Sequence, residues 1–329
     1  MTAVDVPSLI PGVSATTADG TRARLPNRSG VVTAPDGVHI AWDEFGAGDP
    51  TIVLLPSAPI VHSRQWKGQV PYLSRSWRVV TYDGRGNGRS DRPTKPEAYT
   101  DDQYVEDVEL VMDATDTASA VLVGLCMDGV WRAIRLAAEH PERVLGIVAF
   151  AVGVPRLAPS HPWMVEYPFD EELPTNEGWA KKNRHYWLRD YPGFAEFWFS
   201  QTTTEPHSTK AIEDAVGWAV DGSVEAMLAE SDGDEITFDA AQVEDLCRSV
   251  SCPMLIVHGT EDRCQPIARA HRLAQLTGAP LVVVEGANHM IPGRHPVLAN
   301  LLIRDFMDKL ARGEPVNGDA TGGGRRWSR

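Results

Sequence analysis

The feature that most constrains the fold is a repeated alternation of short apolar runs with helical patterns. Runs rich in Val, Ile and Leu lie at residues 51–56, 77–83, 119–124, 144–150, 253–259 and 280–286. Continuous apolar runs of this length indicate strands buried on both faces, as in a parallel sheet covered by helices. Helical patterns lie at residues 63–74, 101–115, 127–140, 265–277 and 295–311. The sequence therefore predicts an α/β fold with a mostly parallel central sheet flanked by helices.

Two features depart from this regular alternation. At the start, extended residues flank the turn signal Pro35-Asp36-Gly37, which predicts an antiparallel hairpin. The second feature is a long insert after the sixth strand of the sheet. It is rich in aromatic residues, including Trp163, Trp179, Trp187, Trp198 and Trp218. We expect a helical cap over the carboxyl edge of the sheet, and most of these rings could equally form the core of the cap itself.

The domain organisation follows from these patterns. We expect one α/β domain with a cap, and not two independent domains. Both ends of the chain are polar or Gly-rich and lack periodicity, which is typical of mobile tails. The predicted boundaries are a flexible N-terminal tail at 1–29, a core at 30–154 and 246–312, a cap at 155–245, and a disordered C-terminal tail at 313–329.

Composition excludes several classes of protein. The formal net charge of −14 repels polyphosphate, and the basic clusters near the termini lack interleaved aromatic residues, so we expect no nucleic-acid partner. No apolar run approaches the roughly 18 residues that a membrane span needs, and the N-terminus does not resemble a secretory signal. The 4 cysteines then fit free thiols in a cytoplasmic protein. Whether the chain forms a homodimer is left open.

Metal and cofactor sites are not predicted. Cys247 and Cys252 are followed by no His or Cys pair at zinc-finger spacing. No G-x-G-x-x-G motif opens a helix after a strand, because the stretch "GRGNG" leads into a loop. We therefore expect no metal ion and no flavin or nicotinamide cofactor.

One cysteine occupies a position from which a side chain can attack a ligand. Cys126 lies in "VLVGLCMDGV", at the turn between the predicted strand 119–124 and the predicted helix 127–140. Such a turn lies at the carboxyl edge of a parallel sheet, where α/β proteins bind ligands. The helix N-terminus also lowers the pKa of a thiol. The position predicts that Cys126 is a nucleophile, and the alternative is a buried thiol that only fills space.

Two further side chains supply what a thiol nucleophile needs, namely a base and a group that orients the base. Asp262 follows the run 253–259 in "HGTEDRCQP", and His289 follows the run 280–286 in "EGANHM". Because all these positions follow buried strands, they are expected at one edge of the sheet. We predict a triad of Cys126, His289 and Asp262.

Over roughly residues 30 to 312 the chain resembles the α/β-hydrolase superfamily. The stretch "YDGRGNGRSDRP" at 82–93 is similar to the D-x-R-G-x-G-x-S turn of cap-bearing members. The acid loop "HGTEDRCQP" and the histidine loop "GANHM" are also similar to those of the superfamily. The resemblance implies the α/β-hydrolase fold and a triad in the order nucleophile, acid, histidine. It says little about substrate, because the fold hosts many chemistries.

The nucleophile turn departs from the family pattern. The usual G-x-S-x-G reads "GLCMD" at residues 124–128, with Gly129 one place later. A cysteine at this position is similar to dienelactone hydrolases and polyhydroxyalkanoate synthases, which form thioester acyl-enzymes. Asp128 replaces the second glycine. Its carboxylate, in the first turn of the helix, either interacts favourably with the helix dipole, or contacts substrate or raises the pKa of the thiol.

The loop after the run 51–56 also departs from the pattern, because it lacks the His-Gly of many members. Alignment onto the family pattern implies that the backbone N–H groups of Met127 and Ala58 form an oxyanion hole, with Ser57 as the alternative to Ala58. We further expect Ser57, Asp128 and three aromatic residues of the insert to line the substrate site. Those three residues are His161, Trp163 and Trp187.

Together these expectations define a reaction. The Cys126 thiolate attacks the acyl carbonyl of an ester, thioester or lactone, and the resulting thioester acyl-enzyme passes its acyl group to water or another acceptor. The expected substrate is a small-molecule or carrier-bound acyl group. Two alternatives remain: a non-covalent lyase, cyclase or carbon–carbon bond hydrolase on the same fold, and a catalytically inactive ligand-binding member.

Overall fold

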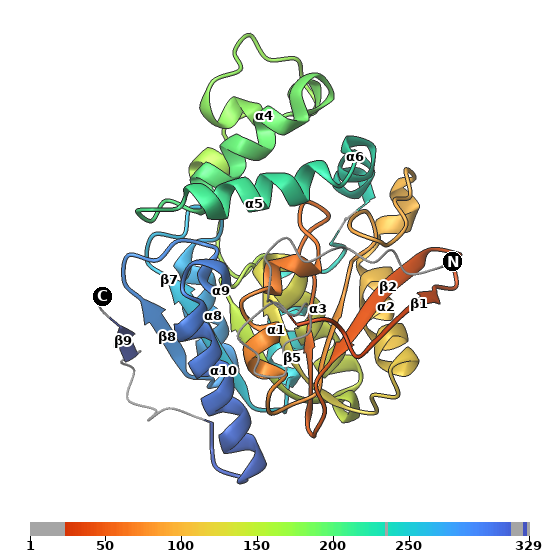
Figure 1. The fold of residues 1–329 in the computed structure, drawn as a ribbon. Helices are drawn as coiled ribbons and strands as arrows, with labels where there is room; N and C mark the ends of the chain where they lie inside the picture. The colour runs from red at the N-terminus through yellow and green to blue at the C-terminus, as the bar shows by residue number, and fades with distance from the viewer. Residues whose placement is uncertain (1–23, 234–235, 317–324, 328–329) are drawn as a thin grey trace, which may run out of the picture.

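The helices of the protein are arranged around a central β-sheet. The structure is a computed structural model that describes residues 24–233, 236–316 and 325–327. Within them the strand order is β1-β2-β4-β3-β5-β6-β7-β8-β9 (Figure 1). The strands are β1 (Arg28–Thr33), β2 (His39–Phe45), β3 (Thr51–Leu54), β4 (Val79–Tyr82), β5 (Ala120–Leu125), β6 (Val144–Phe150), β7 (Met254–Gly259), β8 (Leu281–Val284) and β9 (Arg325–Trp327). β1, β2 and β4 pair antiparallel, and the pairs from β4 to β9 are parallel.

Helices connect the strands and cover both faces of the sheet. The α-helices are α1 (Val70–Leu73), α2 (Asp101–Ala114), α3 (Cys126–Glu139), α4 (Arg184–Thr202), α5 (Thr209–Val220), α6 (Val224–Gly233), α7 (Ala240–Ser249), α8 (Ile267–Thr277), α9 (Ile291–Arg294) and α10 (Pro296–Ala311). Short 3₁₀ helices are η1 (Ser63–Trp66), η2 (Pro96–Tyr99), η3 (Pro141–Arg143), η4 (Pro162–Met164) and η5 (Gly178–Lys181). The predicted core strands and helices are confirmed, except that the single helix predicted at 63–74 is divided into η1 and the short α1.

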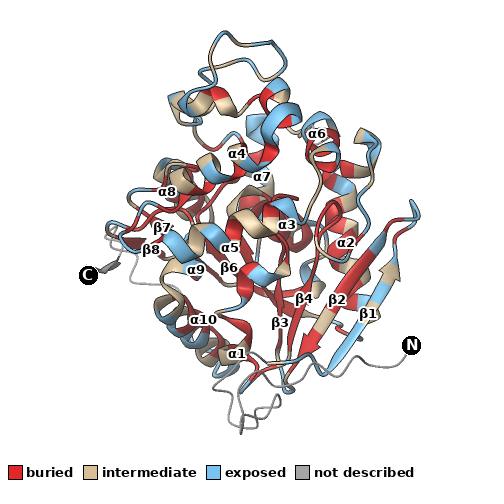
Figure 2. Cartoon of the chain, turned by 45° about the horizontal axis from the view of Figure 1, so that its top comes forward, coloured by how far each residue is buried: buried red, intermediate tan, exposed pale blue. Residues whose placement is uncertain are grey.

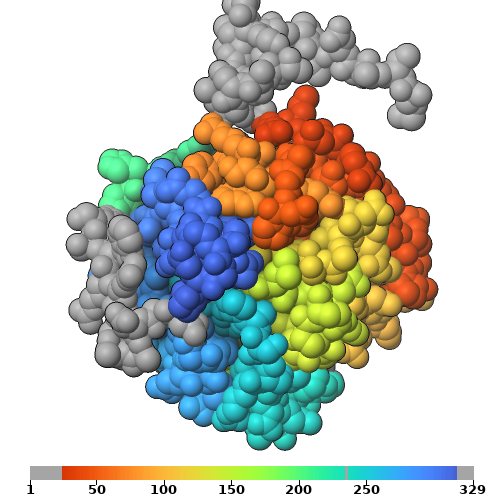
Figure 3. Space-filling model, turned by 90° about the horizontal axis from the view of Figure 1, so that it is seen from below, coloured from red at the N-terminus to blue at the C-terminus, as the bar shows by residue number. Residues whose placement is uncertain are grey.

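The sheet separates two apolar cores. Along β5, Ala120 and Leu122 point into a core shared with α2, α3, α7 and α8, whereas Val121 and Val123 point into a core shared with α1 and α10. This alternation is that of a strand buried on both faces, which explains its continuous apolar sequence. Figure 2 shows the buried strands between the helical layers, with β1 more exposed at the sheet edge. On the side opposite the cap, α10 packs beside the segment that contains α1 (Figure 3).

The insert between β6 and β7 forms a helical cap, as predicted. Its helices α4, α5 and α6 lie over the carboxyl edge of the sheet (Figure 1). They have an apolar cluster of their own, which Ile60 and Val61 join from the loop after β3. The last helix of the insert, α7, instead packs against α3 and α8 of the core. The predicted cap boundary at residue 245 therefore falls inside a helix of the core layer.

The C-terminal segment differs from the predicted tail. Residues 325–327 form β9, which pairs with β8 in parallel. Backbone hydrogen bonding to an open sheet edge accounts for this strand, because it depends little on side-chain composition. Most of the predicted tails, residues 1–23, 317–324 and 328–329, lies outside the described residues. None of the helices described is long and apolar enough to cross a membrane.

The strand β5 and the helix α3 meet at two glycines. A Cβ atom on Gly124 would lie 2.4 Å from the carbonyl carbon and oxygen of Gly129, and one on Gly129 would lie 3.0 Å from the Gly124 Cα. The turn between them holds Cys126 at φ 65°, in the left-handed region. Such a backbone conformation costs a non-glycine residue of the order of 1–3 kcal/mol and persists only where the surrounding structure imposes it. Gly129 is therefore the residue of α3 that lies against β5. Asp128, one residue earlier, is outside this contact and can carry a side chain.

We predict that Gly124→Ala destabilises the protein. The added methyl group cannot be placed without moving the Gly129 backbone, and overpacking of this kind costs about 1–3 kcal/mol in the free energy of unfolding. Urea denaturation measures the change. The matched control is Gly217→Ala in α5, where a Cβ meets nothing within 4 Å. That variant is expected to gain up to about 1 kcal/mol from helix propensity, and equal losses in both variants would contradict this reading.

Candidate active site

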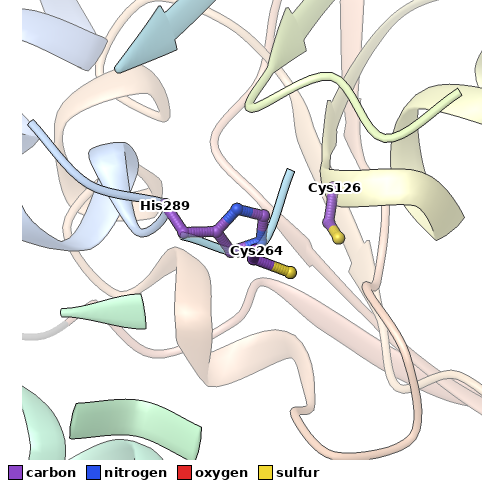
Figure 4. Close-up of side chains that lie close together, drawn as sticks. All are labelled: Cys126, Cys264 and His289. Atoms are coloured by element: carbon purple, nitrogen blue, oxygen red, sulfur yellow. The ribbon is translucent and has the colours of Figure 1, made fainter. Parts of the chain in front are cut away.

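The three side chains of the predicted triad converge at the carboxyl edge of the sheet. Cys126 begins α3 directly after β5, Asp262 lies on the loop after β7, and His289 lies on the loop after β8. Figure 4 shows the Cys126 thiol and the His289 ring facing the same space, together with a second thiol, Cys264. One ligand atom from each of these residues lies within 4.8 Å of the others. The structure thus brings together residues that are far apart in the chain.

Asp262 holds the imidazole of His289 in place. The His289 Nδ1 atom lies 3.1 and 2.9 Å from the two carboxylate oxygens of Asp262. Burial opposes the charge of Asp262, but the charge and hydrogen bond of His289 outweigh it and lower the pKa of the carboxyl group. An ionised carboxylate only accepts hydrogen bonds, so Nδ1 donates and Nε2 is the nitrogen left to face the thiols. This is the orientation that a general base for Cys126 requires.

The environment of Cys126 favours the thiolate. A hydrogen bond from Cys264 and the charge of His289 lower the pKa of the Cys126 thiol well below its usual range, although burial acts in the opposite direction. Burial likewise opposes the charge of His289, but Asp262 and Cys126 raise the pKa of its imidazole well above its usual value. A thiolate beside an imidazolium is the reactive form of a cysteine nucleophile.

Cys264 is a component of the site that sequence reasoning missed. The hydrogen bond to Cys126 raises the pKa of the Cys264 thiol well above its usual value, and burial acts in the same direction. Cys264 therefore keeps its proton while Cys126 gives its proton up. The signal in the sequence was its position two residues after Asp262. The backbone N–H groups of Cys264 and Gln265 each donate to Asp262 Oδ1 at 2.8 Å, which curls the loop back toward the carboxylate.

Gln265 is a second residue that the sequence did not identify. Its amide Nε2 lies 3.5 Å from Cys126 Sγ and 3.7 Å from Cys264 Sγ. Its Oε1 accepts a hydrogen bond from the buried guanidinium of Arg269. Arg269 only donates, so this contact fixes the amide with its NH₂ group toward the sulfur atoms.

A buried histidine braces the same loops. His258, in β7, accepts a hydrogen bond at Nδ1 from the Val152 N–H at 3.0 Å. Its Nε2 contacts the Gln265 carbonyl at 3.1 Å, which makes Nε2 the donor. Burial lowers the pKa of His258 below its usual value despite the nearby charge of Asp262, so the ring is neutral and structural. This ring connects the loop after β6 to the acid loop.

The predicted oxyanion-hole residues lie on two sides of the turn. A Cβ atom on Gly153 would lie 2.3 Å from the Met127 backbone nitrogen, so the absence of a side chain at this position keeps the space beside that N–H clear. Ala58 is partly buried against the cap cluster. The Ser57 hydroxyl lies within hydrogen-bond distance of Gln65 Oε1, at 3.1 Å, and of the Leu125 carbonyl, at 3.3 Å. Ser57 thus tethers this loop to the residue before Cys126.

Asp128 forms an ion pair within α3. Its carboxylate accepts a hydrogen bond from the buried Arg132 side chain at 2.9 Å, and the Arg132 guanidinium stacks on the ring of Tyr104. Burial raises the pKa of Asp128 above its usual value, against the attraction of Arg132. Asp128 therefore has a partner inside the core in addition to its favourable place in the first turn of a helix.

The expected aromatic lining residues lie in two different places. Trp163 donates from Nε1 to the Arg263 carbonyl at 3.0 Å, and it stacks on His161, whose Nε2 contacts the Asp262 carbonyl at 2.9 Å. Both rings thus lie against the acid loop. Trp187 is instead buried in the cap cluster, edge-on to Phe169. Trp187 therefore belongs to the core of the cap, which was the alternative to lining the substrate site.

A cavity lies beside the histidine loop, between the core and the cap. Its volume is about 270 Å³. Residues of η1, α5 and the segment after His289 line it. These are Gln65, Lys67, Gly68, Thr203, Lys210, Ala211, Asp214, Ala215, Trp218, Met290, Pro292, Gly293, Arg294 and Pro296. Met290 follows His289 in the chain, and Gln65 contacts Ser57. The cavity therefore lies near the histidine loop, and Cys126, His289 and Asp262 themselves do not line it.

The chain belongs to the α/β-hydrolase fold family, whose model matches residues 50–296. It is 28% identical over 277 residues to the non-heme chloroperoxidase of Streptomyces lividans, an alignment that covers 82% of this chain and 96% of that protein. It is 25% identical over 241 residues to a bifunctional esterase/perhydrolase of Acinetobacter calcoaceticus, with 72% of this chain and 83% of that protein covered.

A solved structure agrees with this assignment at the level of the fold. The bromoperoxidase of Bacillus anthracis matches with a TM-score of 0.69 and 20% sequence identity, over 85% of this chain and 100% of that one. The chain is thus an α/β hydrolase related to non-heme haloperoxidases and esterases. Membership in this family does not by itself identify the nucleophile, which has to be inferred from the residues of this chain.

We predict that Cys126 reacts rapidly with iodoacetamide at mildly acidic pH. At about pH 6.5 an ordinary thiol with a pKa near 8.5 is only about 1% thiolate, whereas the lowered pKa of Cys126 raises its thiolate fraction. We expect Cys126 to be alkylated at least about ten times faster than free N-acetylcysteine. The rate should fall only when the pH drops below the lowered pKa. Peptide mapping across a pH series measures it.

Cys252 provides the internal control for this experiment. Burial raises the pKa of Cys252 to about 11, so it should stay unmodified under the same conditions. A Cys126 rate that rises about tenfold per pH unit up to pH 8.5, as for an ordinary thiol, would contradict the assignment of a thiolate.

Proposed function

We propose that this protein is an acyl-transfer enzyme with Cys126 as its nucleophile. It takes an acyl group from an ester, thioester or lactone, holds it as a thioester on Cys126, and passes it to water or to another acceptor. The observation that carries the proposal is the convergence of a thiol, an imidazole and a carboxylate, with the bond of 2.9 Å between His289 Nδ1 and Asp262 Oδ2 orienting the imidazole.

The first half-reaction uses the thiolate directly. Cys126 Sγ forms a bond to the acyl carbonyl carbon, and the carbonyl oxygen becomes an oxyanion. The imidazolium of His289 then gives its Nε2 proton to the leaving oxygen or sulfur as the old acyl bond breaks. Asp262 stabilises the imidazolium until that proton leaves.

The second half-reaction reverses these roles. His289, now neutral, removes a proton from the acceptor as the acceptor attacks the thioester carbonyl. Cys126 departs as a thiolate, which the same surroundings stabilise. Because exchanging one thioester for another costs little free energy, a cysteine suits thioester donors and acceptors other than water.

The oxyanion would lie beside the N-terminus of α3. The Met127 N–H sits at the first turn of this helix, where backbone donors and the helix dipole favour negative charge. Ala58, on the opposite loop, is the proposed second donor. Preorganised donors of this kind each typically contribute about 100- to 1000-fold in rate.

The cavity beside the triad supports a small acyl donor that carries negative charge. Its volume of about 270 Å³ lies just below the range of about 300–1,000 Å³ for drug-sized ligands. Its lining carries the cations Lys67, Lys210 and Arg294. Both lysines pair with the one carboxylate, Asp214, which leaves an excess of positive charge. The ester chemistry named for the Acinetobacter relative supports an acyl carbonyl as the reacting group.

We expect an acyl adduct on Cys126 when the protein meets its donor. The protein is incubated with a panel of acyl thioesters, aryl esters and lactones, and intact-mass spectrometry detects the added acyl mass. The adduct should be absent from Cys126→Ala and present in the matched control Cys252→Ala. His289→Ala should form it at least about 100-fold more slowly, because general acid–base catalysis typically contributes that much.

The other candidate functions appear as different outcomes of this experiment. Turnover without an adduct, lost in His289→Ala but kept in Cys126→Ala, would indicate a non-covalent lyase or carbon–carbon bond hydrolase. Binding without turnover, at equal affinity in Cys126→Ser, would indicate a ligand-binding member. Either result overturns the proposal, provided that iodoacetamide still labels Cys126 and so shows an intact site.

A methyl group on Gly153 tests the oxyanion hole separately. In Gly153→Ala the added Cβ would lie 2.3 Å from the Met127 backbone nitrogen, so the first turn of α3 must shift and the Met127 N–H moves with it. We expect acyl transfer to fall by about 100- to 1000-fold, and urea denaturation to show a loss of about 1–3 kcal/mol in the free energy of unfolding. Alkylation of Cys126 by iodoacetamide, which needs no oxyanion hole, should fall less than acyl transfer does. Loss of both rates together would indicate a disturbed fold, and unchanged acyl transfer would exclude the Met127 N–H as a donor.

A further inference from the structure

The acyl-transfer scheme gives the second thiol of the site no role beyond its hydrogen bond to Cys126. Cys126, His289 and Asp262 already supply the nucleophile, the base and the orienting group. Cys264 is only 4% exposed and lies beside Cys126. Figure 4 shows both sulfur atoms and the His289 ring directed into one space. Two thiols and an imidazole are the ligands that zinc prefers.

The distances suit a single metal ion. One atom each from Cys126, Cys264 and His289 lies within 4.8 Å of the others. In a tetrahedral zinc site, Zn–S bonds of about 2.3 Å and a Zn–N bond of about 2.0 Å place the ligand atoms about 3.5–3.8 Å apart. A shift of about 1 Å in the side chains is therefore enough to close the site. Three protein ligands leave a fourth position open, as in catalytic zinc sites.

The surroundings already hold the ligands as a metal site requires. Asp262 binds His289 Nδ1 at 2.9 Å, which leaves the Nε2 lone pair for a metal; a carboxylate behind the histidine is the usual support of a zinc ligand. The Gln265 amide lies 3.5 and 3.7 Å from the two sulfur atoms, where it can donate to thiolates. The supporting contacts thus exist before any ion binds.

The charge balance favours a dipositive ion with two thiolates. Such a set is neutral, and a neutral set is the least costly to bury. Two cations interact electrostatically with the thiols: Arg269, which is buried in α8, and Lys182, which is half-buried in the cap. Both would oppose a site with a net positive charge, so a single thiolate with a dipositive ion would not be favoured. Cys264 supplies the second negative charge.

We propose that Cys126, Cys264 and His289 form a binding site for a thiophilic divalent cation of the zinc type, with Asp262 behind the histidine. Binding forms two metal–sulfur bonds and one bond to Nε2. The proton of Cys264 and the proton shared by Cys126 and His289 leave to solvent. An occupied site ties up the sulfur and nitrogen atoms that acyl transfer needs, so the metal switches that reaction off. The site itself does not depend on the acyl-transfer proposal.

Cobalt(II) titration of the chelator-treated full chain tests the site. Thiolate-to-cobalt charge transfer absorbs in the near ultraviolet, and we expect this band to saturate at one equivalent. Cys264→Ala should weaken cobalt binding by at least about 100-fold, since losing even a supporting residue of a metal ligand costs 10- to 100-fold. Cys252→Ala removes a thiol elsewhere and should leave the titration unchanged. A missing band, or an unchanged one in Cys264→Ala, would overturn the proposal.

Protection of the thiol gives a second readout. Zinc should slow the alkylation of Cys126 by iodoacetamide at least about tenfold in the native chain, and much less in Cys264→Ala. Urea denaturation of Cys264→Ala shows that the variant is folded. Because losing the Cys264 hydrogen bond itself changes the reactivity of Cys126, protection is taken as the ratio of the alkylation rates with and without zinc in each protein. Equal protection in both proteins would mean that Cys264 is no ligand. The cobalt and zinc experiments use no substrate, so their outcome is independent of the acyl-adduct experiment. An acyl adduct on Cys126 without cobalt binding would overturn only the metal site. Cobalt binding without an acyl adduct would overturn only the acyl-transfer proposal.

Discussion

The contact between Gly124 and Gly129 is the constraint on which the rest of the site depends. It lets the end of β5 and the start of α3 approach until no side chain fits between them. The chain can then reverse only through a residue with a left-handed backbone, and Cys126 is that residue. The strain at this turn is sustained by the strands that pair with β5 on both sides, β3 and β6. The packing of the buried strand β5 thus fixes the direction in which the Cys126 thiol points.

Around that thiol, the charged groups depend on one another. Burial acts against the charged forms of Cys126, Asp262 and His289, and each keeps its charge because of its neighbours. Asp262 is the centre of this arrangement, since it accepts hydrogen bonds from His289, from the Cys264 backbone and from the Gln265 backbone. The carboxylate therefore orients the imidazole and also shapes the loop that carries the second thiol. Asp262 thus stabilises the charge of His289 and the conformation of the acid loop together.

Most of the fold was predictable because its signals are local. The apolar runs predicted the strands from β3 to β8, and the turn at Gly37 predicted the hairpin. Cys126, Asp262 and His289 were predictable because each follows a buried strand, so topology alone brings them together. Cys264 and Gln265 were not, because their approach to Cys126 depends on how a single loop curls around Asp262. Trp187 shows a similar limit, since aromatic composition indicates a cap but not which rings face inward. The pairing of β9 depends on an open sheet edge, which composition does not reveal.

The first segment of the insert is fastened to the acid loop at two carbonyl groups. His161 contacts the Asp262 carbonyl and Trp163 donates to the Arg263 carbonyl, while the two rings stack on each other with centroids 4.4 Å apart. The entrance to the cap and the backbone behind the triad carboxylate are therefore one mechanical unit. A displacement of His161 or Trp163 would therefore be passed on to the carbonyl groups of Asp262 and Arg263, next to the carboxylate that holds His289.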